Sequence, residues 1–256
     1  MLVGDTLFVT GGGQGIGEAI ARRLVNEGAR RVTLAGRTQA SLDRVARDLR
    51  GMGAEVATAL LDLQDVDNIR ECVSAAQKAF GPISILANCA GVTDRGGIFD
   101  TTPEVFDRLF HTNVRGNFFL MQAALPAMVE QRRGVVVNIS SMLAHGGLSH
   151  LLPYSATKAA LNLITRNVAH SLRASRVRVH AINLGWTVTP AEHITQTQVH
   201  GFPDDWAERE GDKQPFGRLL TPQDAAGLCA FLASADAAMM TGTVIDLEQW
   251  VSGVLG

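Results

Sequence analysis

The sequence contains few lysines, few cysteines and no long apolar run. Only three of its 23 basic residues are lysines, namely Lys78, Lys158 and Lys213. There is no basic run, and the formal net charge is −2 with a pI near 6.4. The composition therefore gives no electrostatic reason to expect nucleic acid or an anionic membrane as a partner. It favours a protein that binds a small molecule.

The three cysteines, Cys72, Cys89 and Cys229, are odd in number, widely separated and without metal-type spacing. This pattern predicts reduced thiols and a cytoplasmic location. The first ten residues have neither a basic leader nor a long apolar run, so they are expected to form a strand rather than a signal peptide. No membrane span is expected anywhere in the chain.

Short β-branched runs alternate with amphipathic stretches along all 256 residues, of which 46% are hydrophobic. This alternation predicts an α/β fold, with a doubly wound parallel sheet covered by helices on both faces. With no linker, repeat or compositional shift, residues 1–256 are expected to form one domain. The predicted strands are Thr6–Thr10, Arg31–Ala35, Glu55–Leu61, Ile83–Asn88, Val135–Ser140, Arg178–Ile182 and Val244–Leu247.

A glycine-rich segment, Thr10-Gly11-Gly12-Gly13-Gln14-Gly15-Ile16-Gly17, joins the first strand to a predicted helix over Ile16–Glu27. Glycines allow a tight turn and a close approach to a pyrophosphate, and the helix N-terminus offers amide hydrogens to its phosphates. The segment therefore predicts a dinucleotide site. The structural alternative is a tight turn between strand and helix.

Tyr154 and Lys158 are four residues apart within Tyr154-Ser155-Ala156-Thr157-Lys158. On a helix such residues are neighbours, with Cβ atoms about 5–6 Å apart. The ammonium would favour the phenolate of Tyr154 and so make it a usable general acid or base. The alternative is a chance pair, in which the tyrosine packs in the core and the lysine faces solvent.

The spacing Gly11-x-x-x-Gly15-x-Gly17, together with Tyr154-x-x-x-Lys158, resembles the short-chain dehydrogenase/reductase family. The resemblance extends from about Thr6 to Asp246. It implies a single Rossmann-like domain and an NAD(P)-dependent oxidoreductase, which moves a hydride between nicotinamide and a secondary alcohol or ketone. It also implies a homotetramer.

The resemblance assigns catalysis to Asn113, Ser141, Tyr154 and Lys158. Tyr154 would exchange the proton, Lys158 would also bind the nicotinamide ribose, Ser141 would hold the substrate oxygen, and Asn113 would link Lys158 to solvent. Ser140 is a nearby alternative to Ser141. No metal is expected, because the pairs His145 with His150 and His193 with His200 lack a ligand set.

The cofactor would contact residues from several loops. The resemblance assigns these contacts to Gly11, Gln14, Gly15, Ile16, Gly17, Arg37, Asp62, Leu63, Asn88, Ala90, Gly91, Thr187 and Thr189, besides Tyr154 and Lys158. Asp62-Leu63 would contact adenine, and Cys89, within Asn88-Cys89-Ala90-Gly91, is interpreted as a small packed residue. Gly36 stands where NAD-dependent relatives carry an acid, and Arg37 follows it, which favours NADP. Alternatively Arg37 faces solvent or stacks on adenine.

Two motifs depart from the family pattern. Leu184 replaces the proline of N-P-G, so the turn after it is expected to be less restrained. Glu248-Gln249-Trp250 replaces D-G-G, where relatives build subunit contacts, which leaves the details of the oligomer open.

Residues 190–216 are polar and lack periodicity, where relatives carry a mobile substrate lid. This composition favours a small hydroxylated substrate such as a sugar or polyol, although these side chains could simply face water. Two other functions remain open: a 3-oxoacyl thioester reductase, which would need a basic docking patch near the site, and a non-catalytic dinucleotide sensor or scaffold.

Overall fold

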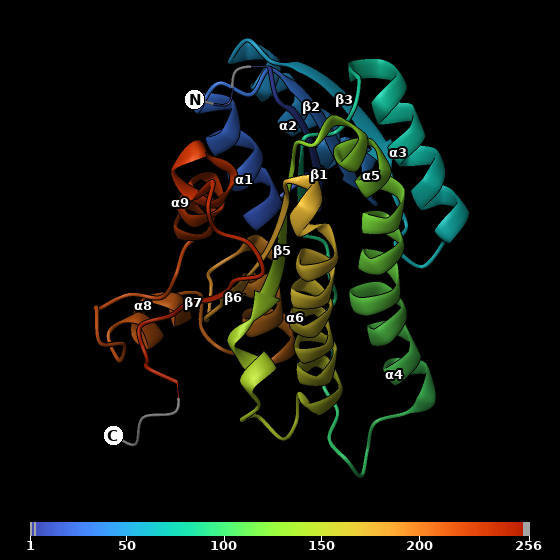
Figure 1. The fold of residues 1–256 in the computed structure, drawn as a ribbon. Coiled ribbons are helices and arrows are strands. Elements are labelled where there is room, and N and C mark those ends of the chain that lie inside the picture. Colours follow the sequence, from blue (N-terminus) through green and yellow to red (C-terminus); the bar gives the residue numbers. More distant parts are fainter. Residues whose placement is uncertain (1, 3, 253–256) are drawn as a thin grey trace.

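Seven parallel strands form one twisted sheet through the centre of the molecule (Figure 1). The computed structural model describes residue 2 and residues 4–252. The spatial order of the strands is β3-β2-β1-β4-β5-β6-β7. Their bounds are β1 (Thr6–Thr10), β2 (Arg31–Gly36), β3 (Glu55–Leu60), β4 (Ile85–Asn88), β5 (Gly134–Ser141), β6 (Val177–Leu184) and β7 (Val244–Leu247). All seven predicted strands are present, with ends that differ by no more than two residues.

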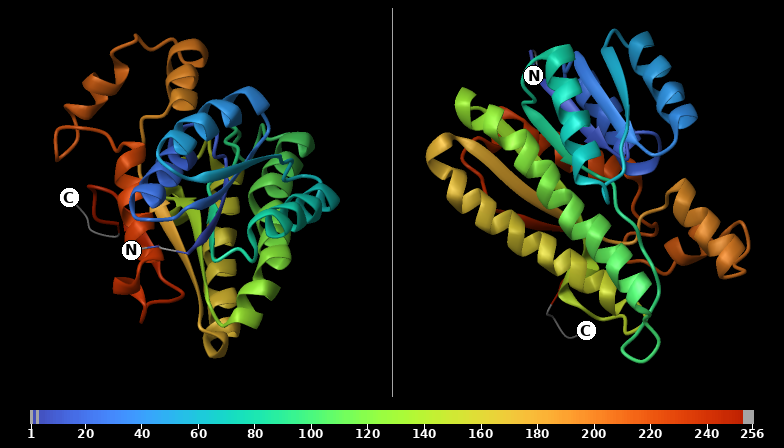
Figure 2. Two further views of the ribbon diagram at one scale, coloured as in Figure 1. Left: turned by 90° about the horizontal axis from the view of Figure 1, so that it is seen from above. Right: turned by 90° about the vertical axis from the view of Figure 1, so that its right-hand side faces the viewer.

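Helices cover both faces of this sheet (Figure 2). One layer contains α1 (Gly15–Asn26), α2 (Gln39–Gly51) and α9 (Pro222–Ala233). The other contains α3 (Val66–Phe80), α5 (Asn117–Gln131) and α6 (Leu152–Leu172). A shorter helix, α4 (Pro103–Phe110), leads into α5 through a π-helical turn, η1 (His111–Gly116). The doubly wound architecture is confirmed.

The central strands are apolar on both sides because a helix layer covers each face. Every residue of β1, β4 and β5 is buried, whereas the edge strand β7 is only partly covered. Residues of one strand therefore divide between two apolar cores: Leu7 and Val9 face α1 and α2, whereas Phe8 faces the opposite layer. This division explains why the strands are continuous apolar runs without a polar alternate.

The helix ends follow the expected capping signals. Thr102 accepts a hydrogen bond from the amide of Val105 at the start of α4, and Thr221 forms a capping box with Asp224 at the start of α9. Helix α3 ends at Phe80, and Gly81 follows it with a φ of 81°. That backbone conformation suits glycine, which has no Cβ to strain.

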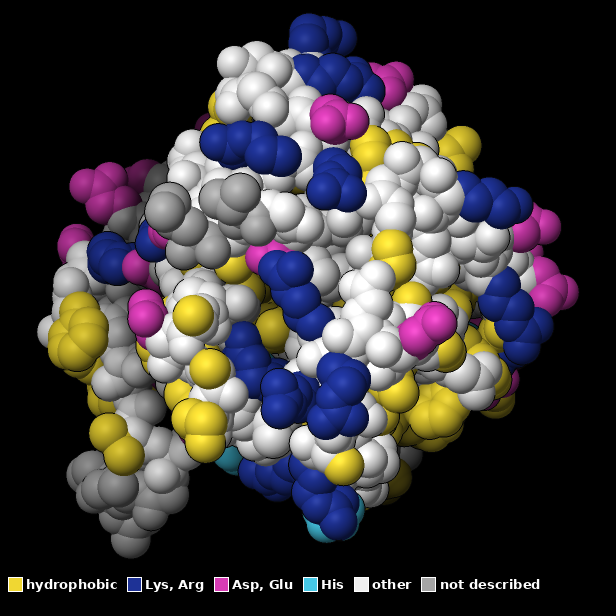
Figure 3. All heavy atoms as spheres, turned by 45° about the horizontal axis from the view of Figure 1, so that its top comes forward, with side chains coloured by type: hydrophobic (Ala, Val, Ile, Leu, Met, Phe, Trp, Pro, Cys, Tyr) yellow, Lys and Arg dark blue, Asp and Glu magenta, His cyan; other side chains and the backbone are white. Residues whose placement is uncertain are grey.

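Arginines serve the helix C-termini at the amino edge of the sheet. Arg31 donates to the carbonyl of Phe80 at the end of α3, and Arg132 donates to that of Ala174 after α6. These carbonyls have no partner within their helices, so a cationic donor is favourable there. The face turned forward in Figure 3 shows several lysine and arginine side chains beside one another.

The chain reverses its order of strands between β1 and β4, which lie side by side at the middle of the sheet. Loops that leave the carboxyl ends of these two strands diverge to opposite sides, and ligands of open parallel sheets bind at such a point. The glycine segment after β1, the segment after β4 and the end of β5 all meet there. The fold thus brings the candidate residues to one edge.

Candidate active site

Tyr154 and Lys158 lie on α6 and point the same way. The Lys158 Nζ lies 5.6 Å from the centre of the Tyr154 ring. Lys158 is only 6% exposed, whereas Tyr154 is partly exposed. The phenol is therefore open to a small molecule, and the ammonium lies behind it. The chance-pair alternative requires a core tyrosine and a solvated lysine. The structure has the opposite, a buried lysine and a partly exposed tyrosine.

The Lys158 ammonium is held at the end of β5. Its Nζ donates a 2.9 Å hydrogen bond to the carbonyl of Ile139. A Cβ added to Gly91 would lie 3.6 Å from this Nζ and 3.1 Å from the Asn113 Oδ1, so the glycine leaves room between the two side chains. Lys158 and Asn113 thus both reach the space beside the Gly91 backbone.

The two serines at the end of β5 differ in what they bind. Ser140 Oγ is 3% exposed and donates to the carbonyl of Lys158 within α6. Ser141 Oγ accepts a 3.1 Å hydrogen bond from the amide of Leu143. Accepting a bond leaves the Ser141 hydroxyl hydrogen available for another acceptor. Ser141 is therefore better placed than Ser140 to hold a substrate oxygen.

Asn113 lies in the π-helical turn η1 and is completely buried. Its amide donates to the carbonyl of Val92 at 2.8 Å and to Thr157 Oγ1 at 3.1 Å, and its Oδ1 accepts from the amide of Val92 at 2.9 Å. The widened turn frees the main-chain carbonyl of Asn113, which accepts from Asn117. Asn113 therefore ties the segment after β4 to the helix that carries Tyr154.

The glycines after β1 form a turn that tolerates no side chains. Gly11 and Gly15 have φ angles of 65° and 56°. A Cβ added to Gly17 would lie 2.4 Å from the carbonyl oxygen of Gly11, and one added to Gly13 would lie 2.7 Å from Ser41 Oγ. These approaches require glycine, as the sequence predicted. They let helix α1 begin directly against the strand.

The N-terminus of α1 is open to a ligand. Gln14 occupies the N-cap position and is exposed, but its side chain forms no capping hydrogen bond. The first amides of α1 therefore need an acceptor, and a pyrophosphate is a suitable one. Ile16 packs against the core behind this turn. The residues present thus fit a dinucleotide.

An ion-pair network that the sequence did not reveal supports the glycine turn. Arg44 of α2 contacts the Glu18 carboxylate at 2.5 Å and donates to the carbonyl of Gly13 at 3.1 Å. Burial opposes the charge of Glu18, but hydrogen bonds from Arg44 and Arg22 outweigh it and lower the pKa of this carboxyl. The pair spans α1 and α2, so no local pattern signals it.

The ends of β2 and β3 carry the residues expected to meet the adenosine. Arg37 follows β2 and is exposed, and within the described part of the chain its side chain forms no hydrogen bond or ion pair. Asp62 is exposed after β3, where its carboxylate accepts from the amide of Gln64, and Leu63 is 5% exposed. Arg37 and Asp62 are thus accessible to a ligand, whereas the Leu63 side chain belongs mainly to the core.

Thr10 holds the turn after β4. Its Oγ1 accepts hydrogen bonds of 3.0 Å from the amides of Cys89 and Ala90. Asn88 is 1% exposed, and its side-chain amide donates to the Asn138 Oδ1 on β5. Burial holds the pKa of the Cys89 thiol well above its ordinary value. This agrees with the interpretation of Cys89 as a packed residue and not a nucleophile.

Backbone hydrogen bonds restrain the turn in which Leu184 replaces proline. The amide of Gly185 donates to the carbonyl of Leu247, and the amide of Val188 donates to that of Leu220. Thr187 is 9% exposed, and Thr189 lies close to Gly15 and caps the next helix. Strand β7 and the Leu220 segment thus restrain this turn. The loss of proline alone predicts a less restrained one.

Residues 190–216 contain short helices that the sequence did not reveal: α7 (Pro190–Ile194), the π-helical η4 (Thr195–Val199) and α8 (Trp206–Gly211). Trp206 is 1% exposed and stacks on Trp186, with ring centres 5.5 Å apart. The two indoles donate to His193 and Glu192 respectively. The segment therefore has a small core of its own and projects beyond the sheet (Figure 1).

The residues that replace D-G-G contact the end of this segment. Gln249 accepts from the amide of Phe216 and donates to the carbonyl of Arg218, and the Trp250 indole donates to Gln214. These bonds lie within one chain. Glu248 lies against Gly185, where an added Cβ would be 2.0 Å from its carboxylate.

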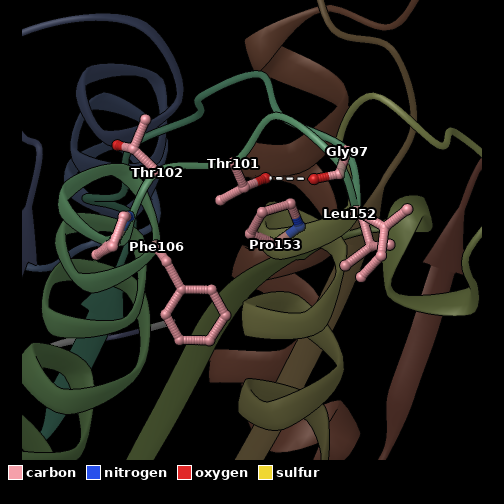
Figure 4. A pocket seen from close by; sticks show the side chains of 8 residues that line it. Gly97, Thr101, Thr102, Phe106, Leu152 and Pro153 are labelled. Atoms are coloured by element: carbon pink, nitrogen blue, oxygen red, sulfur yellow. Dashed lines mark hydrogen bonds between the residues drawn. The ribbon is translucent and has the colours of Figure 1, made fainter.

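An apolar pocket of about 260 Å³ lies beside the start of α6. Phe106 of α4, Leu152 and Pro153 line it together with Thr101, whose hydroxyl donates to the carbonyl of Gly97 (Figure 4). None of the four predicted catalytic residues lines it. No group of three or more potential metal ligands exists among the described residues, and within that part of the chain no helix has the length and apolar character of a membrane span.

Comparison with known proteins decides the family. The family model described as enoyl-(acyl carrier protein) reductase matches residues 11–249. The chain belongs to the short-chain dehydrogenase/reductase family. It is 30% identical over 248 residues to 3-oxoacyl-[acyl-carrier-protein] reductase FabG of Thermotoga maritima, in a match that covers 96% of this chain and 97% of that protein.

Two solved structures of the family carry a nicotinamide cofactor. Actinorhodin polyketide ketoreductase with NADPH aligns with a TM-score of 0.91 at 28% identity, over 99% of this chain and all of that one (100%). NAD⁺-bound xylitol dehydrogenase aligns with a TM-score of 0.89 at 26% identity, over 97% of this chain and 99% of that one. The protein is thus an NAD(P)-dependent oxidoreductase that interconverts an alcohol and a ketone. This excludes the non-catalytic sensor or scaffold.

Proposed function

We propose that the enzyme acts on a small hydroxylated compound, such as a sugar or polyol, and that it prefers NADP. The observation that carries the catalytic part is the buried Lys158 ammonium, 5.6 Å from the ring of the partly exposed Tyr154. A proton must move to or from the substrate oxygen when the hydride moves at the adjacent carbon. Tyr154 exchanges this proton in our proposal.

Each remaining catalytic residue has a separate task. Ser141 donates its free hydroxyl hydrogen to the substrate oxygen and so orients the carbon. Lys158 stabilises the phenolate of Tyr154 through its charge and binds the nicotinamide ribose. Asn113 supports both, because its side chain holds the Val92 backbone and donates to Thr157 on the helix that carries Tyr154 and Lys158. The nicotinamide, when bound, supplies or accepts the hydride.

Preference for NADP rests on the end of β2. Gly36 offers no carboxylate to a ribose hydroxyl, and the exposed Arg37 has no other partner among the described residues. An arginine can contact the additional phosphate of NADP with two hydrogen bonds. Fluorescence titration should show tighter binding of NADPH than of NADH. Equal affinities would contradict the role given to Arg37. The Arg37→Gln variant should weaken binding of NADPH but not of NADH. The control variant, Arg209→Gln, should change neither affinity.

The test of the catalytic assignment is Tyr154→Phe. Removing one hydroxyl should lower kcat about 10²–10⁴-fold, because general acid–base groups contribute about this much. Binding of NADPH should be retained, since the ring remains. Ser155→Ala, one residue away, is the matched control and should leave kcat within a few-fold. A Tyr154→Phe enzyme that keeps its kcat within a few-fold would disprove the assignment.

The substrate class rests on the polar segment 190–216 and on the likeness to xylitol dehydrogenase. A second candidate is a 3-oxoacyl thioester, since FabG of Thermotoga maritima is a relative. The arginines that cap helices do not supply the basic docking patch that this candidate would need, because they lie at the amino edge, opposite the candidate site. A screen of polyols, aldoses and 3-oxoacyl esters decides between them by their kcat/KM values.

We also propose a cytoplasmic homotetramer. Ala156 and Ala159 of α6 are exposed, and so are the neighbouring Phe118 and Leu163, at 43% and 59%. Small residues beside apolar ones suit the close approach of a helix from a second subunit. From the sequence alone, Ala156, Ala159 and Ala160 could equally pack on the sheet, but the exposure of the first two disfavours that packing. Free thiols at all three cysteines suit a reducing compartment. Light scattering tests the tetramer, and Leu163→Glu should dissociate it.

A further inference from the structure

Two basic side chains from different segments of the chain touch each other. Arg95 lies in the segment between β4 and α4, and its guanidinium contacts the Nε2 of His200. His200 ends the π-helical turn η4 of the lid. Because a guanidinium can only donate, the Nε2 of His200 is the acceptor in this contact. Neither partner brings negative charge.

The acidic groups near this contact are already engaged. Asp94 pairs with Arg108, and Asp100 accepts from the amide of Gly97. On the lid, Glu192 accepts from both Trp186 and Gln196. The remaining lid acid near it, Asp204, approaches His193 at 3.9 Å. Among the described residues, Arg95 thus has no carboxylate partner. A guanidinium forms its strongest hydrogen bonds with a carboxylate or a phosphate.

The segment that carries Arg95 lies beside the start of the helix that carries Tyr154. Gly96, next to Arg95, forms a β-bridge with Leu151, and the amide of Leu152 donates to the carbonyl of Gly96. Tyr154 follows Leu151 by three residues, which on a helix is a rise of about 4.5 Å. A molecule that presents its oxygen to Tyr154 and reaches Arg95 would thus bridge the first turn of α6 and the segment after β4.

We propose that Arg95 and His200 bind an oxyanion group of the substrate, a carboxylate or a phosphate, which takes the place of their mutual contact. An anion between them accepts a hydrogen bond from the guanidinium and one from a ring N–H of His200. The lid is then held to the Arg95 segment through the substrate. The assignment of this anion to the substrate rests on the proposed function. It narrows the proposed substrates to hydroxylated compounds that carry an acidic group.

A binding test that does not depend on turnover uses the NADP⁺-loaded enzyme. Tryptophan fluorescence, which reports on the stacked Trp186 and Trp206 of the lid, is followed while malonate or inorganic phosphate is added. We expect a saturable change with malonate, with phosphate or with both, and none with neutral malonamide. The better anion identifies the group. Arg95→Gln and His200→Gln should each weaken binding about 10-fold or more.

The matched control is Arg209→Gln, since Arg209 is an exposed lid arginine that pairs with Asp205 and not with His200. It should leave the anion affinity unchanged. Absence of any saturable response, or an equal loss in Arg209→Gln, would overturn the anion site.

Kinetics separate this proposal from the proposed function. The enzyme is assayed with 3-hydroxybutanoate against its amide, and with glyceraldehyde 3-phosphate against glyceraldehyde. Arg95→Gln should raise KM about 10–100-fold for the anionic member of the better pair, with kcat within a few-fold and the neutral member unaffected. Turnover with equal KM for both members overturns the anion site alone. The enzyme could instead show a saturable anion response that Arg95→Gln removes, and yet be inactive on every hydroxylated compound. That result overturns the proposed substrate class alone.

Discussion

His180 should make the stability of this enzyme depend on pH between about 6.5 and about 4. The side chain lies on β6 and is completely buried. Its Nδ1 lies 2.6 Å from Thr243 Oγ1, and its Nε2 lies 3.2 Å from an Arg178 nitrogen. Burial, helped by the positive charge of Arg178, lowers the pKa of His180 from 6.5 to about 4. The folded protein therefore keeps this imidazole neutral.

The sign of the effect follows from proton binding. Between pH 6.5 and about 4, an exposed histidine of the unfolded chain is protonated and the buried one is not. The unfolded state thus binds more protons, so the free energy of unfolding falls as the pH falls through this interval. The gap between 6.5 and about 4 corresponds to about 3 kcal/mol. Well above pH 6.5, His180 adds no pH dependence to the free energy of unfolding. Below about pH 4, its contribution to that free energy no longer changes with pH.

Urea unfolding at pH 7.5, 6.5, 5.5 and 4.5 measures this term when His180→Asn is compared with the parent at one protein concentration. Asparagine keeps a donor for Thr243 but does not titrate. We expect the variant to be less stable at pH 7.5, because it packs less well, and to lose less stability on acidification. Groups common to both proteins, such as Asp246, cancel in the difference. Parallel pH profiles would refute the reasoning.

Two further substitutions test the cofactor turn and a helix end. Gly17→Ala places a Cβ 2.4 Å from the carbonyl oxygen of Gly11, so the turn must shift and NADPH affinity, measured by fluorescence, should fall about 10-fold or more; an unchanged affinity would contradict the close approach. Thr221→Ala removes the capping box with Asp224, which should lower the free energy of unfolding by about 1 kcal/mol in urea titrations, with no change in kcat.

Features written in consecutive residues could be predicted from the sequence. The strands were found because each is a short apolar run between turn residues, and burial on both faces removes any polar alternate. The glycine turn and the pair of Tyr154 and Lys158 are similarly local, since a helix fixes the relation of residues four apart. The structure brings the Ser141 segment to the same edge only because β5 lies between β4 and β6.

Features that join distant residues could not be predicted. Glu18 and Arg44 lie on different helices, and Trp186 and Trp206 are 20 residues apart, with no spacing that signals either contact. The short helices of residues 190–216 could not be predicted for another reason. Helix α7 has five residues and α8 has six, which is less than two turns, so an apolar periodicity has no length in which to appear.

The choice of lysine at position 158, in a chain whose basic residues are mostly arginine, has a spatial reason. The site behind Tyr154 is buried, and one of the three ammonium hydrogens goes to the carbonyl of Ile139. Asn113 Oδ1 and Lys158 Nζ both lie within 4 Å of the point where a Gly91 Cβ would stand, so the site is compact. A guanidinium there would bring five donors to a buried site, whereas an ammonium brings three. The compact ammonium is held by the Ile139 carbonyl and lies 5.6 Å from the centre of the Tyr154 ring.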